Sequence, residues 1–207
     1  MKAGNKQTQS LQNKFTSLAR PVKVIYVSSY IPRKCGIATF TKDLTTAINL
    51  LNPLALAKIV AMDNALIKDT IVYPHEVRFR IFDQKKADYA RVAAAIDKDP
   101  AIDLVCLQHE FGIFGGPEGR LIGEFFKHLR KPVVVTLHTV LERPSRQVRS
   151  VVRAICKKAA AVVVMLASSA ETLTRTYGVP KEKIAVIHHG VPDFPRHPIR
   201  KAPCYRL

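Results

Sequence analysis

Five short apolar runs constrain the fold of this chain more than any other feature. They are Lys23–Ser28, Leu104–Gln108, Val133–His138, Ala161–Leu166 and Lys183–His188. Each is a nearly continuous run of Val, Ile and Leu, which is typical of parallel strands that are covered on both faces. Two weaker runs, Lys58–Asp63 and Val77–Phe82, fit further strands of the same sheet.

Helical patterns lie between these runs. Residues 37–51 place apolar side chains on one stripe, and residues 89–96 repeat the pattern. Ser168–Glu171 has the pattern of a capping box, which predicts a helix start, and Tyr177–Pro180 predicts a helix end. Alternation of strand and helix over most of the chain predicts an α/β fold, a single doubly wound Rossmann-like domain with a mainly parallel sheet.

The charge is concentrated at the ends of the chain. Residues 1–42 carry eight Lys or Arg and no acidic residue, and residues 194–207 carry four and none. We predict a disordered basic tail over residues 1–20, a domain over residues 21–193, and a basic, proline-containing tail or truncated linker over residues 194–207. The longest uncharged apolar run, residues 159–167, is too short to cross a bilayer, and the start lacks the apolar segment of a secretory signal.

Polar residues gather where four of the predicted strands end. The pairs are Ser28-Ser29, Gln108-His109, His138-Thr139 and His188-His189. Ligands of open α/β sheets bind at the carboxyl ends of the strands, so the alignment favours a binding site over simple solvation.

The loop over residues 108–119 combines a His-Glu pair with two Phe and four Gly. Glycine lets a backbone approach a ligand closely, and aromatic rings offer a face to a sugar or a base. The substrate-binding candidates in this loop are Gln108, His109, Glu110, Phe111, Gly115 and Gly116. Glu110 and Glu118 make a poor acid–base pair because Gly115-Gly116-Pro117 intervenes, and each reads better as a solvated or capping carboxylate.

A second loop follows the first strand. Gly36 opens a helix there, and the unpaired amides of a helix start bind phosphate, with Arg33 and Lys34 beside them. A plain turn capped by glycine is an equal alternative, since the loop is neither a GxGxxG nor a Walker A sequence. The four cysteines show no metal-ligand spacing, so we expect no metal and no cofactor, and Cys35 is more simply a structural residue than a reactive thiol.

Residues 145–158 form a basic amphipathic pattern with Arg146, Arg149, Arg153 and Lys157 on one stripe. Such a helix can lie on an anionic membrane surface, although an ordinary surface helix has the same pattern. Because the excess charge is confined to the tails and residues 127–158, nucleic acid is an unlikely partner. We expect a cytoplasmic chain, with peripheral contact at the inner face of the membrane left open.

Four motifs occur in an order that resembles a known family. They are Pro32–Ala38, Gln108–Gly116, Thr136–Thr139 and Ile187–Asp193. Together they resemble the N-terminal domain of family 4 glycosyltransferases, which pair two Rossmann-like domains in the GT-B arrangement. The resemblance covers about Val22 to Asp193.

This resemblance implies the acceptor-side half of a retaining enzyme that transfers a mannose-like hexose from a nucleotide sugar to a sugar or lipid-linked acceptor. Gly36 would meet the donor pyrophosphate, and His138, the catalytic candidate, would contact the transferred sugar. His109, Glu110 and the glycines after them would line the acceptor side. The family's donor-binding Glu-x7-Glu motif has no proper counterpart, so we expect no activity without a separate donor-binding polypeptide. The alternative is a standalone binding module for a phosphorylated sugar, a nucleotide or an anionic lipid.

Overall fold

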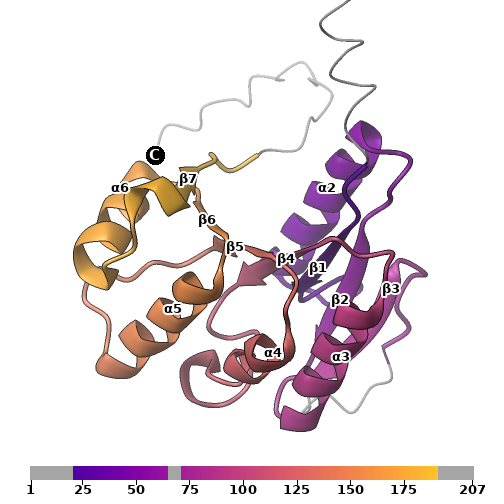
Figure 1. Ribbon diagram of the computed structural model, residues 1–207, viewed down its shortest axis with the longest axis horizontal. Coiled ribbons are helices and arrows are strands. Elements are labelled where there is room, and N and C mark those ends of the chain that lie inside the picture. Colours follow the sequence, from indigo (N-terminus) through magenta and orange to yellow (C-terminus); the bar gives the residue numbers. More distant parts are fainter. Residues whose placement is uncertain (1–20, 65–70, 191–207) are drawn as a thin grey trace, which may run out of the picture.

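The computed structural model describes residues 21–64 and 71–190, and the tails predicted over residues 1–20 and 194–207 lie outside the described residues. Seven parallel strands form one sheet in the order β3-β2-β1-β4-β5-β6-β7 (Figure 1). They are β1 (Val24–Ser28), β2 (Lys58–Asp63), β3 (Val77–Phe82), β4 (Leu104–His109), β5 (Val133–Leu137), β6 (Ala161–Val164) and β7 (Ile184–Val186). The predicted α/β fold and all seven predicted strands are confirmed.

Helices cover the sheet on both faces. The helices are α2 (Gly36–Leu51), α3 (Lys86–Lys98), α4 (Ile122–His128), α5 (Arg146–Lys158) and α6 (Ala167–Thr172), with short turns of other helix types at η1 (Pro117–Gly119), η2 (Leu173–Tyr177) and η3 (Lys181–Lys183). On one face α3, α4 and α5 lie side by side, and α2 packs on the other (Figure 1). Within the described residues, no helix combines the length and apolar character needed to span a bilayer.

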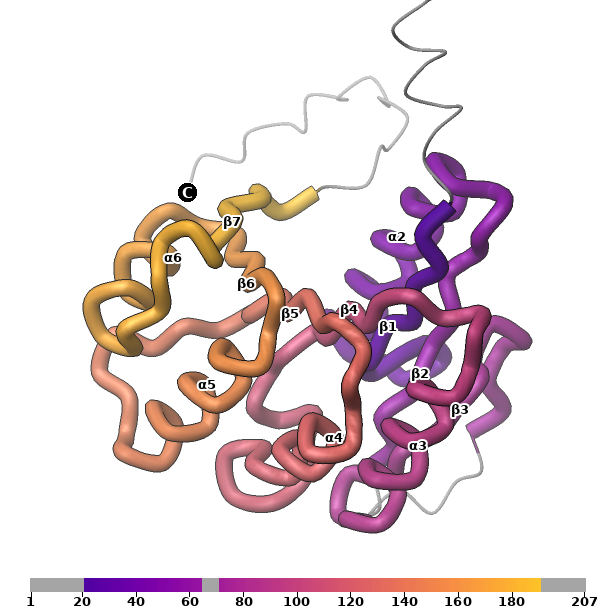
Figure 2. The backbone as a smooth tube through the Cα atoms, viewed as in Figure 1, coloured from indigo at the N-terminus to yellow at the C-terminus, as the bar shows by residue number. Residues whose placement is uncertain are grey.

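The chain reverses its direction of travel across the sheet between β1 and β4. From β1 it moves outward through β2 to β3, and it then returns through α3 to β4 on the other side of β1 (Figure 2). From β4 it proceeds outward through β5, β6 and β7. The loops that leave the carboxyl ends of β1 and β4 therefore diverge, at the position where open α/β sheets bind ligands.

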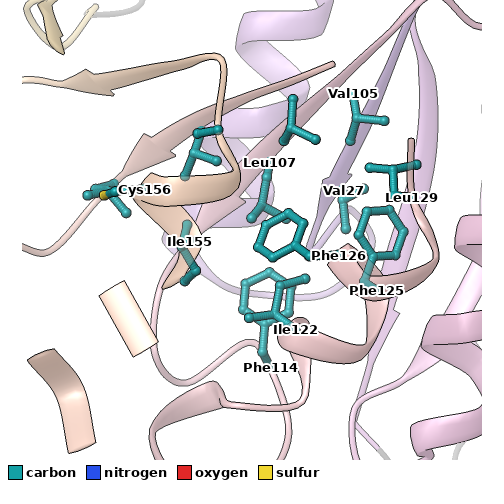
Figure 3. Close-up of a cluster of buried hydrophobic side chains, with 14 of the residues drawn as sticks. Val27, Val105, Leu107, Phe114, Ile122, Phe125, Phe126, Leu129, Ile155 and Cys156 are labelled. Carbon is teal, nitrogen blue, oxygen red and sulfur yellow. The ribbon is translucent and has the colours of Figure 1, made fainter. Parts of the chain in front are cut away.

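The larger core fills the space between the sheet and α3, α4 and α5. Figure 3 shows Phe126 of α4 beside Leu107 of β4, and Phe125 of the same helix beside Leu129 and Val27. A smaller cluster lies under α2, and its buried members are Tyr26, Tyr30, Ala57, Ile59 and Ala61. Both faces of the central strands are thus apolar, which explains why their sequences run without polar alternation.

Helix α2 is present as predicted, but its apolar stripe is not its most deeply buried face. The buried residues are Ala38, Thr41 and Thr45, whereas Leu51 is 83 % exposed. A hydrogen bond of 2.8 Å between the hydroxyl oxygens of Ser28 and Thr41 joins the helix to β1. Small residues on this face let the helix pack closely against the sheet.

The capping box predicted at Ser168–Glu171 is wrong. Helix α6 begins at Ala167, Leu166 is its N-cap, and no side chain caps it. The carbonyl oxygen of Leu166 already accepts the backbone N–H of Ser169 at 3.1 Å, so Ser168 lies inside the first turn. The predicted helix stop is confirmed, because Gly178 adopts a left-handed conformation with φ 70° at the end of η2.

Side chains of α3 form hydrogen bonds with backbone groups of the edge strand β3. The backbone N–H of Phe82 donates to Asp88 Oδ2 at 3.3 Å. Arg91 Nη2 donates to the carbonyl oxygen of Arg80, also at 3.3 Å. One helix therefore both covers the face of β3 and satisfies part of its open edge.

Candidate functional site

His138 follows the last residue of β5 and is held on two sides. Its backbone N–H donates to the carbonyl oxygen of His109 at 3.0 Å, which continues the pairing of β4 with β5. Its Nε2 lies 2.9 Å from Oε1 of Gln108. Its ring meets the ring of Phe40 edge-on, with centroids 4.8 Å apart and planes at 88°. These contacts fix a half-buried imidazole beside the N-terminal part of α2.

The environment of His138 keeps its ring neutral. Burial lowers the pKa of His138, the carboxylate of Glu110 opposes the shift, and His189 lowers the pKa further. With the amide oxygen of Gln108 as acceptor, Nε2 carries the proton, and Nδ1 keeps a lone pair. A neutral ring held in this way can hydrogen-bond to a ligand hydroxyl without the desolvation of a charge.

Gln108 and Glu110 form hydrogen bonds that hold His138 and the loops beside it in place. Gln108 is 1 % exposed, so its amide serves to orient the histidine ring. Glu110 accepts the hydroxyl of Thr139 at 2.6 Å with one oxygen and the backbone N–H of Phe111 at 2.9 Å with the other. Glu110 thus caps polar groups of the neighbouring loops, which is one of the two structural roles that the sequence analysis gave for it. Glu118, the other half of the rejected acid–base pair, lies in η1 with φ 55°.

The imidazole of His109 lies in the core, although the sequence analysis placed it on the ligand-facing surface. The residue is fully buried, and its ring stacks on Phe114 at 5.7 Å and meets Phe111 edge-on at 5.1 Å. Neither ring nitrogen has a hydrogen-bond partner among the described residues. Burial, assisted by the neighbouring His138, lowers the pKa of His109 to about 4. His109 therefore reaches the site only through its backbone carbonyl, which anchors His138.

Gly115 and Gly116 join the loop after β4 to the segment after β3. A Cβ atom on Gly115 would overlap the carbonyl oxygen of Asp83, so the close approach that requires glycine is to the protein's own backbone. The N–H of Gly115 donates to the hydroxyl of Tyr89 at 3.0 Å, and the N–H of Gly116 donates to Gln84 Oε1 at 3.2 Å. These bonds hold the loop in place relative to the strand ends.

The loop after β1 brings the start of α2 to the same edge of the sheet. Gly36 is exposed and is the first residue of the helix, and the N-cap is Cys35, whose Sγ accepts the backbone N–H of Ala38 at 3.4 Å. The guanidinium of Arg33 donates to the carbonyl oxygen of Met62 at 3.3 Å, near the end of β2. The exposed start of α2 at Gly36 thus lies near the Phe40–His138 pair, and a helix start of this kind can bind an anion.

Sequence reasoning missed Phe40 as a member of this site, whereas Thr139 belongs to a polar pair that it placed at the end of a strand. Phe40 also contacts the ring of His189, at 5.1 Å between centroids, so one aromatic ring lies against two histidines. Nothing in a periodic helix pattern separates an apolar residue that faces a site from one that faces the core. Within the described residues, no group of three His, Cys, Asp or Glu side chains is arranged to hold a metal ion.

One family profile and two solved structures are similar to this chain. The profile of Glycosyltransferase Family 4 matches residues 60–193. A glycosyltransferase from Rickettsia africae ESF-5 superposes with a TM-score of 0.56 at 18 % identity, over 84 % of this chain and 44 % of that one. HepE of Anabaena, solved in complex with UDP and glucose, superposes with a TM-score of 0.54 at 14 % identity, over 82 % of this chain and 45 % of its own.

The chain therefore spans less than half the length of either solved structure. No curated protein matches it. The match to the family profile covers most of the described residues, including β4, which carries Gln108, and β5, which His138 follows. This chain belongs to glycosyltransferase family 4.

Proposed function

We propose that this chain is the acceptor-side half of a retaining glycosyltransferase. The enzyme transfers a mannose-like hexose from a nucleotide sugar to a sugar or lipid-linked acceptor. Membership of the family supports sugar transfer, and the complex of HepE with UDP and glucose supports a nucleotide sugar as donor. The observation that carries the proposal is the fixed, neutral imidazole of His138 beside the start of α2.

Each residue of the site has a proposed role. The imidazole of His138 hydrogen-bonds to a hydroxyl of the transferred sugar, and Gln108 keeps the ring in position. The first amides of α2, at Gly36, receive the donor pyrophosphate. The loop from Glu110 to Gly116 borders the acceptor. In a retaining transfer of this kind the donor phosphate assists the acceptor hydroxyl, so the chain needs no nucleophile of its own.

The isolated chain is expected to transfer no sugar from nucleotide sugars to any acceptor. Half of a cleft can neither hold both substrates in reacting geometry nor exclude water. The measurement is a transfer assay with radiolabelled GDP-mannose, UDP-glucose and lipid or sugar acceptors, with a heat-inactivated sample as control. Robust transfer by the purified 207-residue chain would contradict the proposal.

His138→Ala is expected to weaken the binding of a nucleotide sugar about tenfold, because a hydrogen bond to a ligand hydroxyl is lost. The free energy of unfolding should fall by only about 1 kcal/mol, since the ring is half-buried at a strand end. Binding is measured by NMR titration and stability by urea unfolding. His128→Ala, which changes an exposed histidine on α4, is the matched control. Equal binding by the two variants would remove His138 from the site.

A second candidate function is a standalone binding module for a phosphorylated or anionic ligand. The specific observation in its favour is the segment of residues 127–158, which carries nine basic residues and one acidic residue. Addition of a donor-binding polypeptide separates the two candidates, because only a transferase half can gain transfer activity from it.

A further inference from the structure

The basic stripe of α5 faces solvent. Arg146, Arg149, Arg153 and Lys157 are all exposed. The opposite side of the helix is buried in the core through Val148, Val152, Ile155 and Cys156. Among the described residues, none of these four cations belongs to a salt bridge. Within the part of the chain that the structure describes, the helix thus carries a line of unpaired positive charge.

A pocket of about 390 Å³ lies at the C-terminal end of this stripe. Its charged lining consists of Arg153, Lys157 and Lys183, and no acidic residue lines it. The ammonium of Lys183 donates to the carbonyl oxygen of Lys157 at 3.2 Å, which holds it across the end of α5. The chain from Tyr177 to Pro180 forms the opposite wall, where the left-handed Gly178 turns it back toward β7.

The electrostatics of this pocket favour an anion. The C-terminal end of a helix carries about half a negative charge, which its backbone carbonyls concentrate in the last turn. Three full positive charges line the same pocket, so they outweigh that partial charge and repel one another. A dianion such as a phosphate monoester relieves this repulsion and accepts several charge-assisted hydrogen bonds at once.

A second cation-lined pocket, of about 580 Å³, lies along the edge strand β3, but its charges are partly paired. Arg80 forms a salt bridge of 2.6 Å with Asp63, and Arg91 forms one of 3.1 Å with Asp88. Of its basic residues, Arg78 and Lys85 remain outside the salt bridges of the described residues. This pocket has less to gain from an anion, and it supplies a matched control.

We propose that the pocket between α5 and η3 binds a phosphate group. The end of α5 and η3 directly precede β6 and β7, so the pocket lies at the amino edge of the sheet, opposite the edge that carries His138. The phosphate is therefore separate from that of a sugar donor, and the inference is independent of the proposed transferase role. The phosphate can belong to a lipid headgroup or to a soluble phosphorylated molecule, and the line of cations along α5 favours the lipid.

The test uses the whole chain and two probes. One probe is glycerol 3-phosphate, titrated by calorimetry, and the other is vesicles of phosphatidylcholine with or without phosphatidic acid, followed by sedimentation. The pocket variant is R153Q/K183Q, and the control is R78Q/K85Q, which removes the same charge from the pocket at β3. Thermal unfolding verifies that both variants are folded.

The pocket variant is expected to lose affinity about tenfold or more, since each lost cation removes a charge-assisted hydrogen bond, while the control stays within about twofold of the wild type. Binding of glycerol 3-phosphate identifies a soluble source. Binding only to vesicles that contain phosphatidic acid identifies a lipid source. Equal losses in the two variants, or no binding of either probe, would overturn the proposal.

Discussion

Gly115→Ala is expected to lower the free energy of unfolding by about 3 kcal/mol, the range of an overpacked site that cannot relax. A Cβ atom at this position would overlap the carbonyl oxygen of Asp83 and would lie 2.5 Å from its carbonyl carbon. Both atoms belong to the backbone of the segment that follows β3, so no side-chain rotation can make room. The two segments must move apart.

Such a movement disturbs two linked hydrogen bonds, one buried and one partly buried. The N–H of Gly115 donates to the hydroxyl of Tyr89, and that hydroxyl donates to the carbonyl oxygen of Asp83 at 2.8 Å. Urea unfolding measures the loss. Gly112→Ala is the control, because a Cβ atom there meets nothing within 4 Å. If the two variants unfold at the same urea concentration, the packing described for Gly115 is not the one in solution.

Acid is expected to destabilise the protein through His109. The pKa of the buried ring is about 4, whereas an unfolded histidine titrates near 6.5. Above pH 6.5 both states are neutral, and the stability is fully present. As the pH falls from 6.5 toward 4, His109 becomes protonated in the unfolded chain but stays neutral in the folded protein. The expected loss is about 2 kcal/mol at pH 5 and about 3 kcal/mol below pH 4.

His109→Phe isolates this effect. The variant cannot titrate at that position, and it removes two ring nitrogens that have no partner among the described residues. We expect it to be at least as stable as the wild type at pH 7 and to lose less stability at pH 5. Other groups that titrate in acid, such as Glu76, are common to both proteins and cancel in the difference. Parallel pH profiles for the two proteins would show that His109 is not buried neutral.

The sequence predicts the sheet well because its strands are buried on both faces. It also predicts that Gln108 and His138 come together, since consecutive parallel strands are usually neighbours and their carboxyl ends meet. It does not predict the direction of His109. Val105, Leu107 and His109 alternate onto the face of the larger core, but Leu104 and Cys106 are apolar as well, so the pattern does not distinguish the two faces.

The remaining differences arise from contacts between distant segments. The local sequence pattern predicts that Gly115 allows a ligand to approach the backbone. The structure shows that the residue which approaches Gly115 is Asp83, 32 residues earlier in the chain. Phe40 belongs to a helical stripe by spacing, and only the placement of β5 brings it against His138. Ser168 matches a capping motif by its letters, whereas backbone hydrogen bonds start the helix at Leu166. Tertiary packing decides each case.

The hydrogen bonds from α3 to β3 have a consequence for the behaviour of the protein at high concentration. An open strand at the margin of a parallel sheet is a template on which a strand of another molecule can grow. Here the carboxylate of Asp88 already accepts the N–H of Phe82, and the guanidinium of Arg91 already donates to the carbonyl oxygen of Arg80. An incoming strand must displace a carboxylate and a guanidinium before it can pair. Helix α3 thus protects the protein against self-association at this margin.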